Sequence, residues 1–229
     1  MPIGIAMSLA LPSSVVASLP AAETVGATDE TLWTDVAAKG VDNYTRSKTL
    51  AERAVWEFLE GAGSKRGLTV ATILPGMIQG PLLTGSVSGS VELVSRLLTG
   101  KVAAIPNIGF AIVDVRDLVE LHLKAMLAPA AQDQRFVAAG DFLWLSEIAA
   151  LLRERFGARA AKVPTRMMPN FVIRLAAIVQ QEARFFAPKL GVKREFSCAK
   201  AARLLDWHPR SARESILDSA ESLFARGLA

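Results

Sequence analysis

Two apolar runs, separated by an amphipathic segment with helical periodicity, constrain the fold of this chain more than any other feature. One run covers residues 3–12 and ends at Pro12, and the other, Leu68–Leu74, is followed by Pro75. Short continuous apolar runs of this kind are typical of strands that are buried on both faces. Because the connection between them is long enough for a crossover helix, we expect two parallel strands in an α/β fold.

The connecting helix is predicted over about residues 42–60. Asp42 and Asn43 are favourable N-cap residues, and Gly61 and Gly63 end the helical pattern. Its apolar positions form one stripe, which we expect to face the sheet: Leu50, Ala51, Ala54, Val55, Phe58 and Leu59. Residues 18–41, which precede the helix, contain the turn-forming residues of a loop.

Beyond residue 80 the pattern is mainly helical. We predict a short strand over residues 134–139 and helices over residues 90–99, 116–128, 146–156 with Ser146 as the N-cap, 168–184, 197–205 and 210–226. The chain therefore divides into a sheet-forming part, residues 1–80, and a mainly helical part, residues 81–229. The helical part should also contain one or more short strands that return to the sheet.

The composition is that of a folded globular protein of ordinary charge. Hydrophobic residues make up 51% of the 229 residues and charged residues 21%, and the formal net charge is only +4. Basic residues are scattered along the chain, so we expect neither a nucleic-acid partner nor a membrane partner. Cys198 is the single cysteine, which excludes an internal disulfide, and with two histidines we expect no metal site.

The first twenty-two residues allow two interpretations. They combine an apolar run with a stretch of small residues, as a secretory signal does, but they contain no Lys or Arg. We therefore favour a buried strand and a cytoplasmic protein, in keeping with the single cysteine. Cleavage after Ala22 is the alternative, and it would remove Ser13 and Ser14.

The only tyrosine of the chain stands four residues before a lysine. On a helix, Tyr44 and Lys48 would lie on the same face, one turn apart. An ammonium group beside a phenol favours the phenolate and lowers the phenol pKa from its usual value of about 10. A tyrosine of this kind can exchange a proton with a substrate oxygen near neutral pH, which is the chemistry of a carbonyl/alcohol oxidoreductase.

The surroundings of this pair strengthen the interpretation. The first predicted strand ends in Ser13 and Ser14, and the second ends in Pro75–Gly76. Ligands of parallel α/β sheets bind outside the carboxyl ends of the strands. The serines, the start of the Tyr44 helix and the Pro75–Gly76 turn should therefore meet at one edge of the sheet.

At this point the chain resembles the extended short-chain dehydrogenase/reductases of the NAD-dependent epimerase/dehydratase type, particularly the dihydroflavonol, cinnamoyl-CoA and aldehyde reductases. The matching segments are Ser13–Val15, Tyr44–Trp56, Leu74–Pro81, Val113–Leu118 and Lys200–Pro209. The resemblance implies a partial Rossmann-like parallel sheet, its carboxyl-terminal half, with a smaller helical substrate-binding portion. Residues 1–80 would then be a remnant of the dinucleotide-binding domain that carries the site.

Residue roles carried over from the resemblance describe a reductase site. Tyr44 would be the acid/base, and Lys48 would hold the nicotinamide ribose and lower the tyrosine pKa. Ser14 would polarise the carbonyl of a small aldehyde or ketone, with Ser13 as the alternative. The backbone from Pro75 to Ile78 would pass beside the nicotinamide of NADP or NAD.

The sequence also departs from the family. It contains no Gly-x-x-Gly-x-x-Gly after a strand, and Met1 stands about where the family's fifth strand begins. We therefore expect a homodimer or a partner chain that completes the sheet. Two other functions remain open: a non-catalytic remnant or assembly module that cannot bind dinucleotide alone, and a sugar-nucleotide epimerase or dehydratase that uses the same tyrosine and lysine.

Overall fold

The computed structural model describes residues 7–20, 26–63, 67–83, 85, 87 and 89–229. Its internal contacts divide the chain into two compact units. Unit 1 comprises Met1–Gly76, Arg116–Ala139 and Glu195–Pro209, and unit 2 comprises Met77–Val115, Gly140–Arg194 and Arg210–Ala229. The chain leaves unit 1 after Gly76 and then returns to that unit twice, and the domain division expected at residue 80 stays a prediction.

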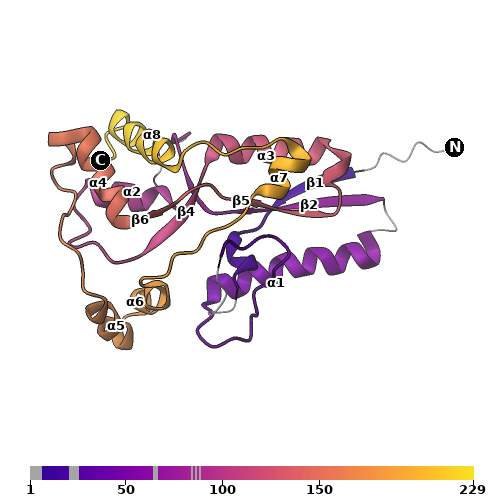
Figure 1. Cartoon of the computed structure of the whole chain (residues 1–229), viewed down its shortest axis with the longest axis horizontal. Coiled ribbons are helices and arrows are strands. Elements are labelled where there is room, and N and C mark those ends of the chain that lie inside the picture. The colour runs from indigo at the N-terminus through magenta and orange to yellow at the C-terminus, as the bar shows by residue number, and fades with distance from the viewer. Residues whose placement is uncertain (1–6, 21–25, 64–66, 84, 86, 88) are drawn as a thin grey trace. The chain divides into compact units, whose positions relative to one another are not determined.

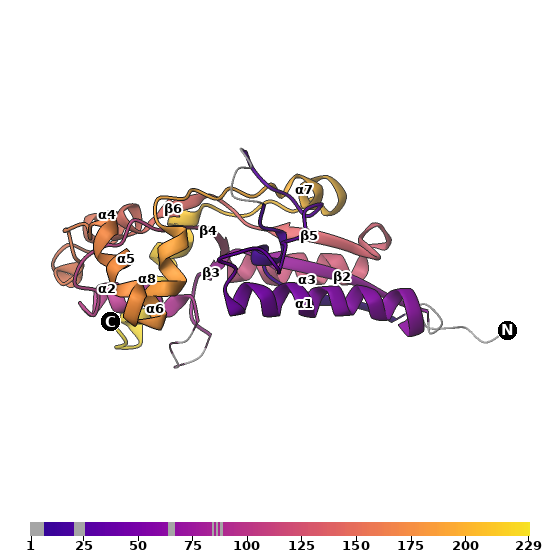
Figure 2. The same ribbon diagram turned by 90° about the horizontal axis from the view of Figure 1, so that it is seen from below.

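Unit 1 contains a three-stranded parallel sheet in the order β1-β2-β5. Its strands are β1 (Met7–Pro12), β2 (Leu68–Pro75) and β5 (Gln134–Ala138). Helix α1 (Asn43–Phe58) covers one face of the sheet and α3 (Val115–Leu127) lies on the other, as Figures 1 and 2 show. The α/β fold with parallel strands is therefore confirmed, whereas residues 3–6 of the first predicted strand lie outside the described residues.

The core of unit 1 forms between this sheet and its helices. Ile73, Leu74, Phe136 and Val137 on the two inner strands have no exposed surface. Helix α7 (Ala199–Leu205) contacts β5, and Trp207 follows it. The buried indole Nε1 of Trp207 donates a hydrogen bond to the backbone oxygen of Asp117, at 2.7 Å. This bond joins the segment after α7 to α3 and satisfies a donor that burial would otherwise leave unpaired.

Helix α1 buries a different face from the one expected. Thr45, Thr49 and Glu52 are buried, whereas Leu50 is 48% exposed and Phe58 is 47% exposed. The apolar stripe predicted to face the sheet therefore lies largely on the solvent side of unit 1. At its end α1 passes into a π-helical turn, Leu59–Gly63.

Unit 2 is built on a second three-stranded sheet, in the order β3-β4-β6. Strands β3 (Met77–Gln79) and β4 (Gly109–Asp114) are parallel, and β6 (Phe142–Trp144) is antiparallel to β4. Helix α8 (Ala212–Ala225) packs on β3, on β4, on α2 (Val91–Leu98) and on α4 (Leu145–Phe156). None of these three short strands was predicted from the sequence.

Two helical predictions in unit 2 need correction. Helix α4 begins at Leu145, so Ser146 is inside the helix, and the backbone N–H of Trp144 is instead bonded by the Glu147 carboxylate at 2.8 Å. The helix predicted over residues 168–184 is two helices, α5 (Asn170–Val179) and α6 (Gln181–Phe186), because Gln180 adopts an extended backbone conformation. Among the described residues, short helical turns lie at Val15–Ser18, Pro129–Ala131, Gly157–Ala160 and Ala187–Lys189.

A buried polar cluster holds the turn after β3 in unit 2. The Ser219 hydroxyl lies 2.9 Å from Gln79 Oε1 and accepts a hydrogen bond from the Gly80 backbone N–H at 2.7 Å. Gly80 has a φ of +118°, and a Cβ atom there would lie 3.0 Å from the carboxylate oxygens of Asp114. Glycine is therefore required at this position for both its conformation and the closeness of Asp114.

Within the described ranges, no helix is both long and apolar enough to cross a membrane.

Candidate active site

The two serines lie at the carboxyl end of β1, in unit 1, and both are buried. The backbone N–H of Ser13 donates to the Ile73 oxygen at 2.6 Å, which extends the β1–β2 pairing by one bond. The Ser13 hydroxyl donates to Glu52 Oε2, also at 2.6 Å. Ser14 caps the following helical turn, where its Oγ accepts a hydrogen bond from the Val16 N–H at 3.4 Å.

Tyr44 and Lys48 stand in the first two turns of α1. The Asp42 carboxylate caps this helix by accepting a hydrogen bond from the Thr45 N–H at 2.8 Å. Tyr44 is 52% exposed and Lys48 is partly buried. With 3.6 residues per turn, both side chains lie beside the buried row that begins with Thr45, on the same flank of the helix.

The serines and the tyrosine helix belong to neighbouring elements of the same unit. The helical turn Val15–Ser18 that Ser14 caps packs against α1. The carboxyl end of β1 and the amino-terminal part of α1 therefore contribute to one region of unit 1. The roles expected for Ser14, Tyr44 and Lys48 are chemically compatible with this placement and stay predictions.

The two residues expected beside the nicotinamide fall in different units. Pro75 is the buried last residue of β2 in unit 1, and the Gly76 N–H that follows it donates to the Ala138 oxygen at 3.0 Å. Ile78 is partly buried in β3 of unit 2. Their expected role in cofactor binding also stays a prediction.

A buried carboxylate, Glu52, organises this end of unit 1. Besides the Ser13 hydroxyl, it accepts a hydrogen bond from the Thr72 hydroxyl at 2.7 Å. Arg135 Nε donates to Oε1 at 2.8 Å and Arg135 Nη2 donates to Oε2 at 3.3 Å, a bidentate ion pair between side chains that are almost fully buried. The four donors come from the residue that follows β1, from β2 and from β5, so one carboxylate on α1 connects to the end of β1 and to the other two strands of the sheet.

Arg135 extends this network into the loop before α1. Its Nη1 donates to the backbone oxygens of Glu30 and Leu32. Its guanidinium carbon also lies 3.7 Å from the ring centroid of Trp33, a cation–π contact. The loop that follows the serine pair is therefore held by the same buried arginine that neutralises Glu52.

Glu30 and Lys200 form a second group of ionisable side chains in unit 1. Burial raises the pKa of the Glu30 carboxyl, although the nearby Lys200 opposes this change. Burial likewise lowers the pKa of the Lys200 ammonium, and Glu30 opposes that change. Burial also raises the pKa of the Cys198 thiol, which disfavours the thiolate that a catalytic cysteine requires.

The Glu52 network was missed from the sequence because its partner Arg135 is 83 residues away. A local signal did exist: Thr45, Thr49 and Glu52 recur at helical spacing, as a buried polar row would. Within the described ranges, no group of three or more His, Cys, Asp or Glu side chains could hold a metal ion.

Comparisons with known proteins give the relatives of this chain. No protein-family model matches the sequence. Cinnamoyl-CoA reductase 1 of Oryza sativa subsp. japonica is 36% identical over 130 residues, which are 56% of this chain and 37% of the rice protein. Cinnamoyl-CoA reductase 1 of Petunia hybrida is 33% identical over 130 residues, which are 56% of this chain and 38% of that protein. The chain thus matches about two fifths of the length of these relatives.

Solved structures share the fold over nearly the whole chain. Yeast methylglyoxal/isovaleraldehyde reductase Gre2 complexed with NADPH superimposes with a TM-score of 0.74 at 21% identity, over 97% of this chain and 65% of its own. Vestitone reductase from alfalfa gives 0.72 at 20% identity, over 97% and 66%. UDP-glucose 4-epimerase from Thermotoga maritima, with UDP-glucose, gives 0.69 at 20% identity, over 97% and 64%.

The parallel α/β sheet and these relatives indicate the class of proteins to which this chain is similar. Over just over half of its length the chain is similar in sequence to reductases of the extended short-chain dehydrogenase/reductase family, and it shares the fold of solved proteins of the NAD-dependent epimerase/dehydratase type. The sequence relatives are cinnamoyl-CoA reductases, and the structural relatives include a methylglyoxal/isovaleraldehyde reductase that was solved with NADPH.

Proposed function

We propose that this chain carries the proton-transfer site of an NAD(P)-dependent reductase that converts a small aldehyde or ketone to an alcohol. The observation that supports the proposal most directly is the placement of the Tyr44–Lys48 helix start and the Ser13–Ser14 turn in adjoining elements of unit 1. The rice and petunia relatives are named as reductases of a carbonyl compound, cinnamoyl-CoA.

The residues of unit 1 suit the nicotinamide end of a dinucleotide. Lys48 is partly buried, and its ammonium group can bond ribose hydroxyls and stabilise the Tyr44 phenolate. The sequence has no glycine-rich strand–turn–helix segment of the kind that binds a pyrophosphate. When bound, the cofactor supplies the hydride.

The protein side chains would then polarise the carbonyl and transfer the proton. The Ser14 hydroxyl donates a hydrogen bond to the carbonyl oxygen and stabilises the negative charge that develops there. Tyr44 gives its proton to that oxygen as the alcohol forms, and Lys48 stabilises the resulting phenolate. Ser13 is less suited to the carbonyl, because its hydroxyl is bonded to Glu52.

The proposal is tested by replacing Tyr44 with phenylalanine. Reduction of a panel of aldehydes and ketones is followed with NADPH and with NADH, and cofactor affinity is measured by nicotinamide fluorescence. Loss of the acid should lower kcat by about 10²–10⁴-fold and leave the cofactor dissociation constant nearly unchanged. Arg46→Gln, an exposed position on the same helix, is the matched control and should turn over like the wild type. A Tyr44→Phe variant with wild-type kcat would disprove the acid/base role.

A second function, an assembly module, is favoured by two surfaces of unit 1. Among the described residues β1 pairs with β2 alone, and Leu50 and Phe58 leave an apolar stripe of α1 about half exposed. Unpaired strand edges and exposed apolar faces recruit further chains, either a second copy or a partner that completes the sheet. A chain that binds neither NADPH nor NADH, yet forms an oligomer of defined mass in light scattering, would support this function over catalysis.

An epimerase or dehydratase function remains within the same proposal, because it would use the same tyrosine and lysine for transient hydride transfer. Release of alcohol product with net oxidation of NADPH distinguishes the reductase.

A further inference from the structure

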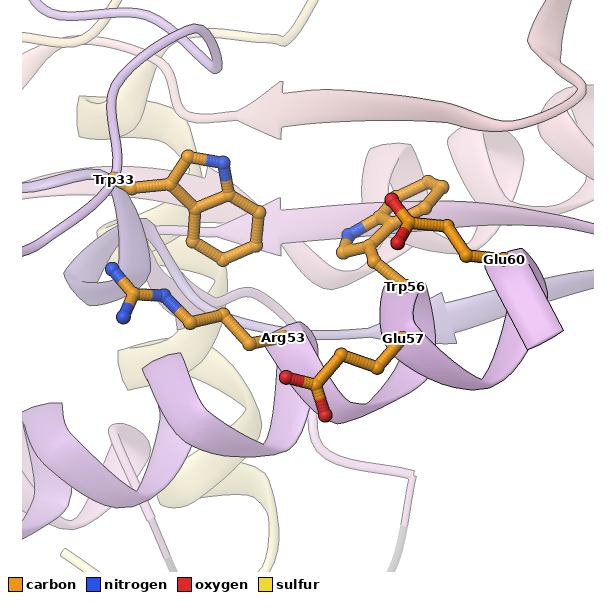
Figure 3. Close-up of a pocket in the computed structure, with 5 residues that line it drawn as sticks. All are labelled: Trp33, Arg53, Trp56, Glu57 and Glu60. Carbon is orange, nitrogen blue, oxygen red and sulfur yellow. The ribbon is translucent and has the colours of Figure 1, made fainter.

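A cavity that is open to solvent lies in unit 1, apart from the proposed active site. It has a volume of about 360 Å³ and is lined by Trp33, Arg53, Trp56, Glu57 and Glu60 (Figure 3). Four of these residues follow i, i+3, i+4 and i+7 spacing at the carboxyl end of α1 and in the π-helical turn after it. At 1.5 Å per residue, Arg53 is about 13 Å along the helix axis from Tyr44, so the two sites are separate.

The cavity has one wall that is held rigidly. The Trp33 ring lies 3.7 Å from the guanidinium of Arg135, which Glu52 fixes, and 5.5 Å from that of Arg53. Arg53 is itself bonded to the Thr34 oxygen at 3.2 Å. Both guanidiniums are therefore engaged with the protein, and Trp33 presents a fixed aromatic surface to the cavity.

The opposite wall contains a hydrogen-bond donor that lacks an acceptor. The indole Nε1 of Trp56 is buried and has no hydrogen-bond partner among the described residues. A buried polar group left without a partner costs about 1–3 kcal/mol, and such groups are uncommon in folded proteins. Figure 3 shows the Trp56 ring on the far side of the cavity from Trp33, with its nitrogen edge toward that ring.

Two carboxylates add negative charge to this wall. Glu57 and Glu60 are exposed, and Figure 3 shows the Glu60 carboxylate extending back toward the Trp56 ring. Glu60 stands in the π-helical turn Leu59–Gly63, a deviation from α-helix that is frequent at functional sites. The wall thus combines an aromatic face, two carboxylates and an unsatisfied N–H donor.

We propose that this cavity is a binding site for a small organic cation that carries an oxygen acceptor near its cationic head, such as a quaternary-ammonium alcohol. The methylated head would lie on the Trp56 indole, where cation–π attraction favours positive charge. The Glu57 and Glu60 carboxylates leave the lining with a net negative charge, although the Arg53 guanidinium opposes them in part. The adjacent oxygen would accept the Trp56 Nε1 hydrogen bond. A volume of about 360 Å³ accommodates such a molecule, and the site does not depend on the proposed reductase function.

The ligand chemistry is tested with three probes on the full chain without cofactor. Choline has both the cation and the oxygen, tetramethylammonium has only the cation, and 3,3-dimethylbutan-1-ol has the shape and the oxygen without the charge. The four tryptophans give four indole N–H signals in a ¹⁵N NMR spectrum, and the Trp33→Phe and Trp56→Phe variants assign two of them.

Choline should move the Trp33 and Trp56 signals saturably and leave the signals of Trp144 and Trp207 unchanged. The charge should make choline bind about 5–30-fold more tightly than the neutral alcohol. The hydrogen bond should make it bind about 3–10-fold more tightly than tetramethylammonium. Equal affinity for choline and the neutral alcohol, or no saturable shift with any probe, would overturn the proposal.

Variants of the exposed carboxylates complete the test, because they should not disturb folding. Glu57→Gln and Glu60→Gln should each weaken choline binding, and the double variant should weaken it by about tenfold or more. Glu154→Gln, an exposed position on α4 in unit 2, is the matched control and should bind like the wild type. Unchanged choline affinity in the double variant would show that the carboxylates do not form the site.

Discussion

The adjacent serines at the end of β1 differ in what their hydroxyl groups contact. Ser13 donates its proton to the buried Glu52 carboxylate at 2.6 Å. The Ser14 oxygen accepts a backbone hydrogen bond, which leaves its proton for another acceptor. This difference assigns Ser13 to the stability of unit 1 and supports Ser14 as the proposed donor to the substrate carbonyl.

We therefore expect the two alanine variants to fail in different ways. Ser13→Ala should lower the free energy of unfolding by about 1.5–3 kcal/mol, the usual contribution of a hydrogen bond to a charged group, with kcat little changed. Ser14→Ala should lower kcat by about 10²–10³-fold. Its loss of stability should be the smaller one, about 0.5–1 kcal/mol, because its capping bond is long at 3.4 Å. Urea denaturation and steady-state kinetics measure the two effects. The reverse pattern would make Ser13 the donor to the carbonyl.

Glu30 should make the stability of the chain depend on pH. Because burial raises its pKa above the ordinary 4.5, the folded chain binds this proton more tightly than the unfolded chain does. The contribution of this carboxyl to stability is therefore present below pH 4.5 and is lost as the pH rises through the folded-state pKa.

Glu30→Gln should then be more stable than the wild type at neutral pH, and the difference should close as the pH falls below 4.5. Urea midpoints over a series of pH values measure the difference, with Glu154→Gln as an exposed control. A Gln variant that is less stable than the wild type at neutral pH would show that attraction to Lys200 outweighs the effect of burial.

At the scale of single elements, helix α1 shows what local patterns can and cannot predict. The start of the helix was predicted from the Asp42 cap, and its end was predicted from Gly61 and Gly63. The hydrogen bond of the cap is present. The buried face of α1 was predicted wrongly, because apolar periodicity favoured Leu50 and Phe58 over the polar row with Glu52. The sheet surface beneath α1 contains Thr72 and the distant Arg135, and a local window cannot include a partner so far along the chain.

The same reasoning explains the elements of unit 2 that were missed. Strands β3 and β6 have three residues each, and they become strands only because β4 lies between them. Long-range pairing of this kind has no local signature. The Tyr44–Lys48 pair, by contrast, is a short-range motif on one helix, so the sequence was sufficient to locate it.

The Glu52–Arg135 pair should couple α1 to the sheet. Glu52→Leu or Arg135→Met alone leaves a buried charge without its partner, and each should lower the free energy of unfolding by about 3–5 kcal/mol. The double variant restores neutrality and should lose much less than the sum of the two. Chemical denaturation of the four proteins measures the coupling, and strictly additive losses would contradict it.

At the scale of the whole molecule, the two units are interleaved along the chain. Unit 1 needs residues 1–76 and also 116–139 and 195–209. The segment 116–139 supplies β5 and Arg135, and 195–209 supplies α7 and Trp207. A cut at residue 80 therefore separates β2 from its neighbour β5 and Glu52 from its counter-ion.

A fragment of residues 1–80 should accordingly fail to fold. We expect a circular dichroism signal without a cooperative transition in urea, whereas the full chain unfolds cooperatively. The same fragment with Glu52→Leu separates the effect of the unpaired charge from that of the lost strand, and it should also remain unfolded. A cooperative transition in the 1–80 fragment would mean that β1, α1 and β2 form an independent domain.

This interleaving has a consequence for how such proteins can be recombined. Exchanging unit 2 for that of a relative means replacing residues 77–115, 140–194 and 210–229 together, because no single crossover point moves it whole. Simple gene shuffling would produce hybrids whose cores are assembled from mismatched parents. A chain of this kind is therefore expected to change its specificity more readily by point substitutions than by exchange of the whole of unit 2.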